Sequence, residues 1–180
     1  MIKQNGYLIG KLIITHLCMA IFGIMVTIPF STENITTRTF CLVLGIVSVL
    51  LYAYLVYIDV WEIGAKDGID VSVGKQKSMP FKGMIIALVA AIPDILLCGA
   101  YIILWYFRSY SEALAQSYII VSLTTSLWEG AFIGIKSAVF GETFAYYFAI
   151  VPFFPVLIAE IAYLFGTKDK LCLAKHKSKK

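Results

Sequence analysis

Five apolar runs, each long enough to cross a lipid bilayer, constrain the fold of this chain more than any other feature. A membrane-spanning helix needs about 20 mostly apolar residues. The five runs are Tyr7–Phe30, Thr39–Trp61, Met84–Phe107, Ser117–Val139 and Phe144–Phe165. Only 14% of the residues are charged and 60% are hydrophobic, whereas about 25% of a soluble domain is charged. We therefore expect an all-α fold, a polytopic integral membrane helical bundle with four to five transmembrane helices.

The polar segments between the runs are short, which predicts one membrane domain followed by a charged tail. We expect a single transmembrane domain over residues 1–166 and a polybasic tail over residues 167–180. The longest hydrophilic segment, 62–82, is expected to form a loop because it is rich in turn-forming residues. These residues are Gly64, Gly68, Gly74 and Pro80, and Gly83 follows the segment directly. The six lysines of the tail predict contact with anionic lipid headgroups of the bilayer.

The distribution of lysines predicts the orientation, because short segments rich in Lys and Arg stay in the cytoplasm. Segment 62–82 carries four lysines, so we expect a cytoplasmic loop there. The N-terminus and the tail also carry lysines, which favours the cytoplasm for both termini. Four crossings place segment 62–82 and both termini in the cytoplasm, whereas five crossings put the two termini on opposite sides of the membrane. We therefore prefer four crossings with 113–142 as a re-entrant or broken segment, since this run contains Glu129 and Lys136. Five plain spans are the alternative.

Four ionisable residues inside the apolar runs are candidate solute-binding residues. They are Asp94, Glu129, His16 and Glu160. Asp94 is the strongest candidate because it lies near the middle of its run and follows Pro93, a residue that tends to kink a helix. A charged carboxylate at mid-bilayer costs about 2.5–3.5 kcal/mol on insertion scales, so it normally has a partner or a cavity. The alternative is an ordinary buried polar contact, for example with His16 or a tyrosine hydroxyl.

A second polar cluster follows the second apolar run. Its carboxylates are Asp59, Glu62, Asp67 and Asp70. Hard cations bind several carboxylate oxygens, so these residues are weak candidates for a metal site. We prefer the alternative of a solvated helix end, on which Glu62 and Lys66 have the spacing of a helical ion pair. His16 has no second histidine or acid at ligand spacing along the chain, so the sequence does not favour a metal role for it.

The function expected from these features is that of a transport-related membrane subunit that binds a solute in an intramembrane cavity. The alternative is a non-catalytic interaction, assembly or immunity-type protein that binds another membrane protein. A lipid-modifying enzyme ranks third, because no known local hydrolase or nucleotide-binding motif occurs in the chain. We expect no cofactor. We expect no nucleic-acid partner, since the tail lacks arginine and aromatic residues. The expected location is a bacterial plasma membrane.

Overall fold

The computed structural model describes residues 5–27, 35–77, 79–140 and 147–177, with the backbone alone at 35, 140 and 169–177. All elements in this part of the chain are helical. Three helices are long and apolar enough to cross a membrane: α1 Gly6–Thr27, α2 Ile35–Ser72, and a segment that ends in α8 Phe153–Lys177. The number rises to five if each of two broken helix pairs is counted as one span. The expected all-α class is confirmed, and these helices are compatible with a membrane location.

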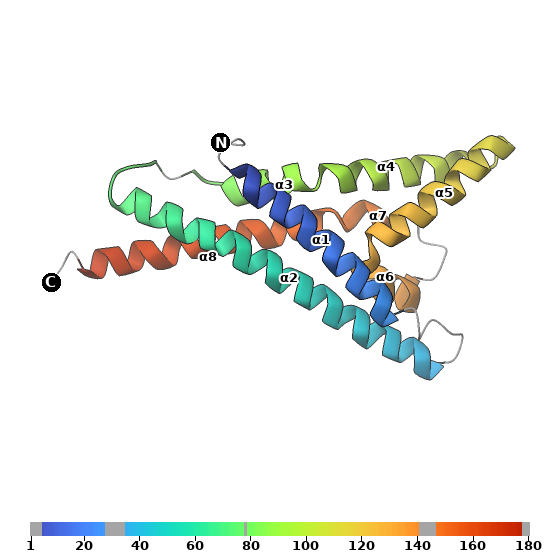
Figure 1. The fold of residues 1–180 in the computed structure, drawn as a ribbon, viewed down its shortest axis with the longest axis horizontal. Helices are drawn as coiled ribbons and strands as arrows, with labels where there is room; N and C mark the ends of the chain where they lie inside the picture. Colours follow the sequence, from blue (N-terminus) through green and yellow to red (C-terminus); the bar gives the residue numbers. More distant parts are fainter. Residues whose placement is uncertain (1–4, 28–34, 78, 141–146, 178–180) are drawn as a thin grey trace. The chain divides into compact units, whose positions relative to one another are not determined.

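The chain divides into two compact units, which are described separately. Unit 1 contains Met1–Ile13, Ala53–Ala90 and Phe153–Lys180, and unit 2 contains Ile14–Tyr52 and Ala91–Pro152. In unit 1, helix α3 Lys82–Ala90 packs along α8 (Figure 1). In unit 2, helices α4 Ile92–Phe107 and α5 Glu112–Trp128 form an antiparallel hairpin. Unit 2 also contains the short elements η3 Gly130–Phe132, α6 Ile133–Ile135, η4 Lys136–Phe140 and α7 Tyr147–Ile150.

The prediction of a loop over 62–82 is wrong for its first half, because α2 continues to Ser72. Glycines that were interpreted as helix breakers lie instead where α2 approaches α8. A Cβ atom at Gly64 would meet the carbonyl oxygen of Tyr163, and one at Gly68 would lie 2.7 Å from the carbonyl oxygen of Thr167. These two glycines therefore allow close helix packing. Among the predicted turn glycines only Gly74, with a φ of 74°, adopts the left-handed conformation of a turn.

The fourth apolar run is broken, as the sequence analysis allowed. The segments Glu112–Trp128 and Gly130–Val139 are bent by 76° relative to each other. The break follows Glu129, whose backbone leaves the helical conformation with a φ of −86° and a ψ of 23°. Gly130 and Gly134 then pack against the main chains of α1 and α2, at Ala20 and Cys41. The end of the predicted segment, residues 141–142, lies outside the described residues, and the expectation that the segment does not cross the membrane stays a prediction.

The predicted tail is not separated from the last span by a helix break. Helix α8 runs through the expected boundary at residue 167 and continues to Lys177. Its side chains are described only as far as Lys168. The predicted contact between the tail lysines and lipid headgroups therefore concerns side chains outside the described part of the structure, and stays a prediction.

Candidate functional site

Three of the four predicted solute-binding residues come together in unit 2. His16 from α1, Asp94 from α4 and Glu129 from the end of α5 are buried, with exposed fractions of 7%, 4% and 1%. One potential ligand atom from each residue lies within 4.8 Å of the other two. Within the described ranges this is the only group of three His, Cys, Asp or Glu side chains at such spacing. We call these three residues the acid–imidazole centre.

Asp94 lies in the first turn of α4, just after a break in the third apolar run. The third apolar run is divided at Ala91 into α3 and α4, and Pro93 occupies one of the first two positions of α4. Proline suits this position because its missing N–H would have no partner in the first helical turn. The partial positive charge at the helix N-terminus also stabilises a carboxylate there. The predicted interruption of the helix beside Asp94 is therefore present, as the break at which α3 ends and α4 begins.

His16 is held by hydrogen bonds at both ring nitrogens. Nε2 lies 3.1 Å from the carbonyl oxygen of Trp128, and Nδ1 lies 3.0 Å from the hydroxyl oxygen of Tyr52. A carbonyl oxygen only accepts hydrogen bonds, so Nε2 carries a proton and donates. In the neutral ring, Nδ1 therefore accepts from the Tyr52 hydroxyl. The lone pair on Nδ1 is the one that a proton or a metal ion would take.

Cys98 is a neighbour of the centre that the sequence analysis did not single out. It follows Asp94 by one helical turn, and its Sγ lies 3.5 Å from Asp94 Oδ1 and 3.8 Å from Glu129 Oε1. The thiol has one proton, which it can donate weakly to either carboxylate. The spacing of four residues from Asp94 on a predicted helix was the one sequence signal that placed Cys98 on the same face. Tyr52, 36 residues from His16, had no such signal.

Glu129 has a buried oxygen without a hydrogen-bond partner. Cys98 contacts Oε1, whereas Oε2 accepts no hydrogen bond from any residue that the structure describes. Burying an unsatisfied carboxylate oxygen is costly, so such atoms call for a proton, a water molecule or an ion. Two carboxyl groups as close as those of Asp94 and Glu129 also repel each other when both are ionised. The centre therefore favours binding of positive charge.

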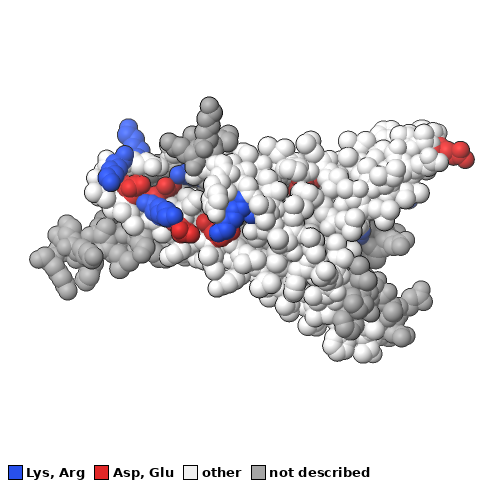
Figure 2. Space-filling model, in the orientation of Figure 1, with Lys and Arg blue, Asp and Glu red and all other residues white. Residues whose placement is uncertain are grey.

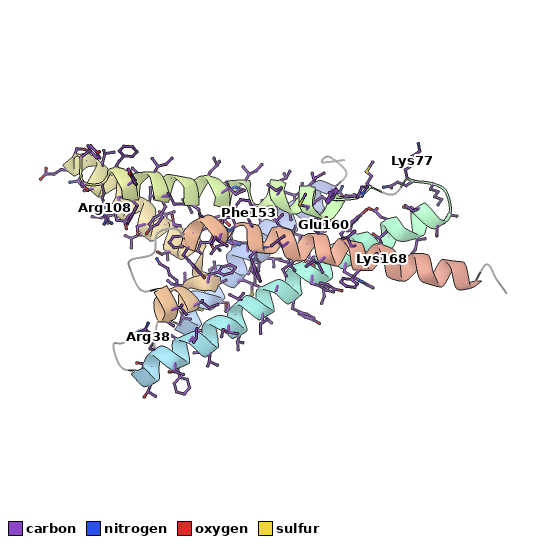
Figure 3. The ribbon with its side chains drawn as sticks, turned by 180° about the vertical axis from the view of Figure 1, so that it is seen from behind. Arg38, Lys77, Arg108, Phe153, Glu160 and Lys168 are labelled. Carbon is purple, nitrogen blue, oxygen red and sulfur yellow. The ribbon has the colours of Figure 1, made fainter. Side chains whose placement is uncertain are left out.

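Glu160, the fourth predicted residue, lies in unit 1 and is not part of the centre. Figure 3 labels Glu160 on α8. Its carboxylate accepts a hydrogen bond of 2.9 Å from the backbone N–H of Met84 on α3. This bond satisfies one of the free N–H groups in the first turn of α3. The position of Glu160 inside the last apolar run is thus accounted for by a contact between α8 and α3.

Three of the four weak metal candidates on α2 have lysine partners. In Figure 2 the charged side chains gather over the C-terminal half of this helix, in unit 1. Asp59 pairs with Lys11 at 2.8 Å, and Glu62 pairs with Lys66 at 2.7 Å. Asp67 accepts 2.6 Å and 2.8 Å hydrogen bonds from Lys82 and Tyr163. Asp70, the remaining candidate, belongs to no group of three potential ligands among the described residues.

Comparison with known proteins identifies no relative. No protein-family model matches the chain, and no curated protein or solved structure is significantly similar to it. The function is therefore inferred from the acid–imidazole centre and from the apolar helices that carry it.

Proposed function

We propose that this chain is a transport-related membrane protein that binds a divalent metal ion at the acid–imidazole centre. The observation that carries the proposal is the meeting of His16, Asp94 and Glu129, with potential ligand atoms within 4.8 Å of one another. The centre is buried among helices that are compatible with a membrane location. Ionisable residues inside a membrane are costly and normally mark the path of an ion or a solute.

The donor atoms support a first-row transition metal. They comprise one imidazole nitrogen and two carboxylates, with the Cys98 thiol adjacent to both carboxylates. Mixed nitrogen, oxygen and sulfur donors are typical ligands of Zn²⁺, Co²⁺ and related ions, whereas Mg²⁺ and Ca²⁺ prefer oxygen alone. A dication also balances the two carboxylates, which neutral solutes do not.

The hydrogen bonds of His16 suit a metal ligand. A histidine that binds a metal usually donates its other N–H to a carbonyl or a carboxylate, which fixes the ring orientation. The contact from Nε2 to the Trp128 carbonyl has this arrangement and leaves Nδ1 as the ligand atom. Metal binding at Nδ1 would require the Tyr52 side chain to move aside, because its hydroxyl oxygen lies 3.0 Å from Nδ1 in the direction of the lone pair.

Titration with Co²⁺ tests the proposal, because its visible absorption reports both coordination and a thiolate ligand. We expect the purified full-length chain in mild detergent to bind about one equivalent. Asp94→Asn and Glu129→Gln should each weaken binding by about 100-fold, since each removes an anionic ligand. Glu160→Gln is the matched control, because Glu160 lies outside the centre and the amide oxygen still accepts from Met84. Cys98→Ala should remove the thiolate band if sulfur is a ligand.

Uptake of the same ion into proteoliposomes tests transport separately from binding. Flux that is lost in Asp94→Asn and retained in Glu160→Gln would support both parts of the proposal. Metal binding without uptake of the ion into proteoliposomes would support the metal site and contradict the transport role. A folded wild-type chain that binds none of Mn²⁺, Co²⁺ and Zn²⁺ would overturn the metal site.

A further inference from the structure

A cavity whose lining includes none of the three residues of the acid–imidazole centre lies in unit 2. Its volume is about 540 Å³, within the range of small-molecule binding sites. Tyr101 and Trp105 of helix α4 line it, together with Arg108, the residue that follows α4. Their spacings of four and three residues place them on one helical face. Helix α5 lines it with Tyr118, Ser122 and Ser126, again on one face. Lys136 from η4 completes the lining. We call this cavity the hairpin pocket.

Arg108 is held over the hairpin pocket by two aromatic rings. Its guanidinium carbon lies 5.2 Å from the centre of the Trp105 ring and 5.3 Å from the centre of the Tyr118 ring. Cation–π contacts of this kind orient a guanidinium group without neutralising its charge. No carboxylate among the described residues forms an ion pair with Arg108. Figure 3 shows Arg108 where the chain passes from α4 to α5.

The serines of the pocket differ from the other hydroxyl residues of α5. Ser117, Thr124 and Thr125 each donate to the backbone carbonyl one turn earlier. Ser122 and Ser126 line the cavity, and their hydroxyls form no hydrogen bond with another described residue. The O–H groups of Ser122 and Ser126 are therefore available to donate hydrogen bonds to a ligand. The hydroxyl of Tyr118 lies 3.4 Å from that of Tyr101 and adds a further polar pair at the pocket wall.

The charge of the residues that line the hairpin pocket indicates the class of ligand that it binds. Two cations, Arg108 and Lys136, line the hairpin pocket, and no aspartate or glutamate does. A fixed guanidinium, an ammonium group and hydroxyl donors are the groups that bind phosphate oxygens. We propose that the hairpin pocket binds a phosphate group. An anionic lipid headgroup or a free phosphate compound would present the same chemistry.

The surroundings of the pocket suit either source. The exposed aromatic residues Tyr106, Phe107 and Tyr110 follow Trp105 at the end of α4. Aromatic side chains at the end of an apolar helix are typical of the membrane interface, where lipid phosphates lie. A soluble phosphate compound reaches the same depth from water. Separate binding measurements distinguish the two sources.

The experiment measures binding of phosphatidylglycerol and of inorganic phosphate to the full-length chain. Native mass spectrometry counts phosphatidylglycerol bound from mixed micelles, with phosphatidylcholine as the zwitterionic comparison. Isothermal titration measures inorganic phosphate in detergent. We expect one site for at least one of the two anions. Arg108→Gln should weaken its affinity by about ten-fold, because charge-assisted hydrogen bonds are lost. The affinity of Arg108→Lys should lie between those of the wild type and Arg108→Gln, since lysine keeps the charge and loses the planar donor pair.

Two control variants separate the pocket from general electrostatics and from the metal centre. Lys77→Gln removes one positive charge at an exposed position far along the chain from the pocket and should leave binding unchanged. Asp94→Asn should also leave phosphate binding unchanged, because Asp94 does not line the pocket. An affinity for phosphatidylglycerol alone would identify the lipid as the source, and an affinity for inorganic phosphate would identify a soluble compound. Equal binding in Arg108→Gln and Lys77→Gln, or binding of neither anion, would overturn the proposal.

Discussion

Replacing Lys82 with methionine is expected to lower the free energy of unfolding by about 3–5 kcal/mol. Lys82 begins α3 and is 7% exposed, and its Nζ donates a 2.6 Å hydrogen bond to Asp67 Oδ2. Asp67 is also buried, and its second partner is the hydroxyl of Tyr163. Methionine fills most of the space of lysine but leaves the carboxylate of Asp67 without its cation. A buried charge without its partner costs more than the pair contributed.

Chemical or thermal unfolding of the full-length chain in detergent measures this effect. Lys66→Met is the matched control, because Lys66 and its partner Glu62 are both exposed, with side-chain exposures of 68% and 58%. Solvent screens such a pair, so the control should have a much smaller effect. The double variant Lys82→Met with Asp67→Leu should recover part of the lost stability, since it removes the unpaired charge. Equal destabilisation by Lys82→Met and Lys66→Met would contradict the importance of the buried pair.

The helical class could be predicted from the sequence because hydropathy is a local property. A run of about 20 apolar residues is long enough to span a membrane whatever its neighbours are. Helix ends were less predictable, and α2 shows the reason. Gly64 and Gly68 resemble loop residues when read alone, yet each faces the main chain of α8, about 100 residues away in sequence. Close packing between distant helices, and not local backbone freedom, explains these glycines.

The members of the acid–imidazole centre could be predicted singly but not as a group. His16, Asp94 and Glu129 each stood out because a polar ionisable group in an apolar run is costly. Their meeting depends on the packing of three helices, which no spacing along the chain reports. Tyr52 was missed for the same reason: its link to His16 is a tertiary contact. Asp67 likewise gave no sign of its buried pairing with Lys82 and Tyr163.

The packing that assembles the centre leads to a second large effect, at Gly130. Replacing Gly130 with alanine is expected to destabilise the chain by about 3 kcal/mol, because the backbone of α1 leaves no space for a methyl group. A Cβ atom at Gly130 would meet the carbonyl oxygen of Ala20 and lie 2.6 Å from Ile24 Cγ1. Gly23 faces the same contact from α1, where a Cβ atom would lie 2.6 Å from the Cα of Ala131. Neither main chain can move without separating α1 from the segment that begins at Gly130.

Separation of these segments would also open the centre, because Gly130 follows Glu129 directly and Ala20 follows His16 by one helical turn. The hydrogen bond from His16 to the Trp128 carbonyl crosses the same contact. Gly130→Ala should therefore weaken Co²⁺ binding as well as lower the unfolding temperature in detergent. Gly10→Ala on α1 is the matched control, since no heavy atom lies within 4 Å of its added Cβ. Alanine there should raise stability by up to about 1 kcal/mol, as expected for glycine replaced inside a helix, and leave Co²⁺ affinity unchanged. Native stability and affinity in Gly130→Ala would show that this contact does not position the centre.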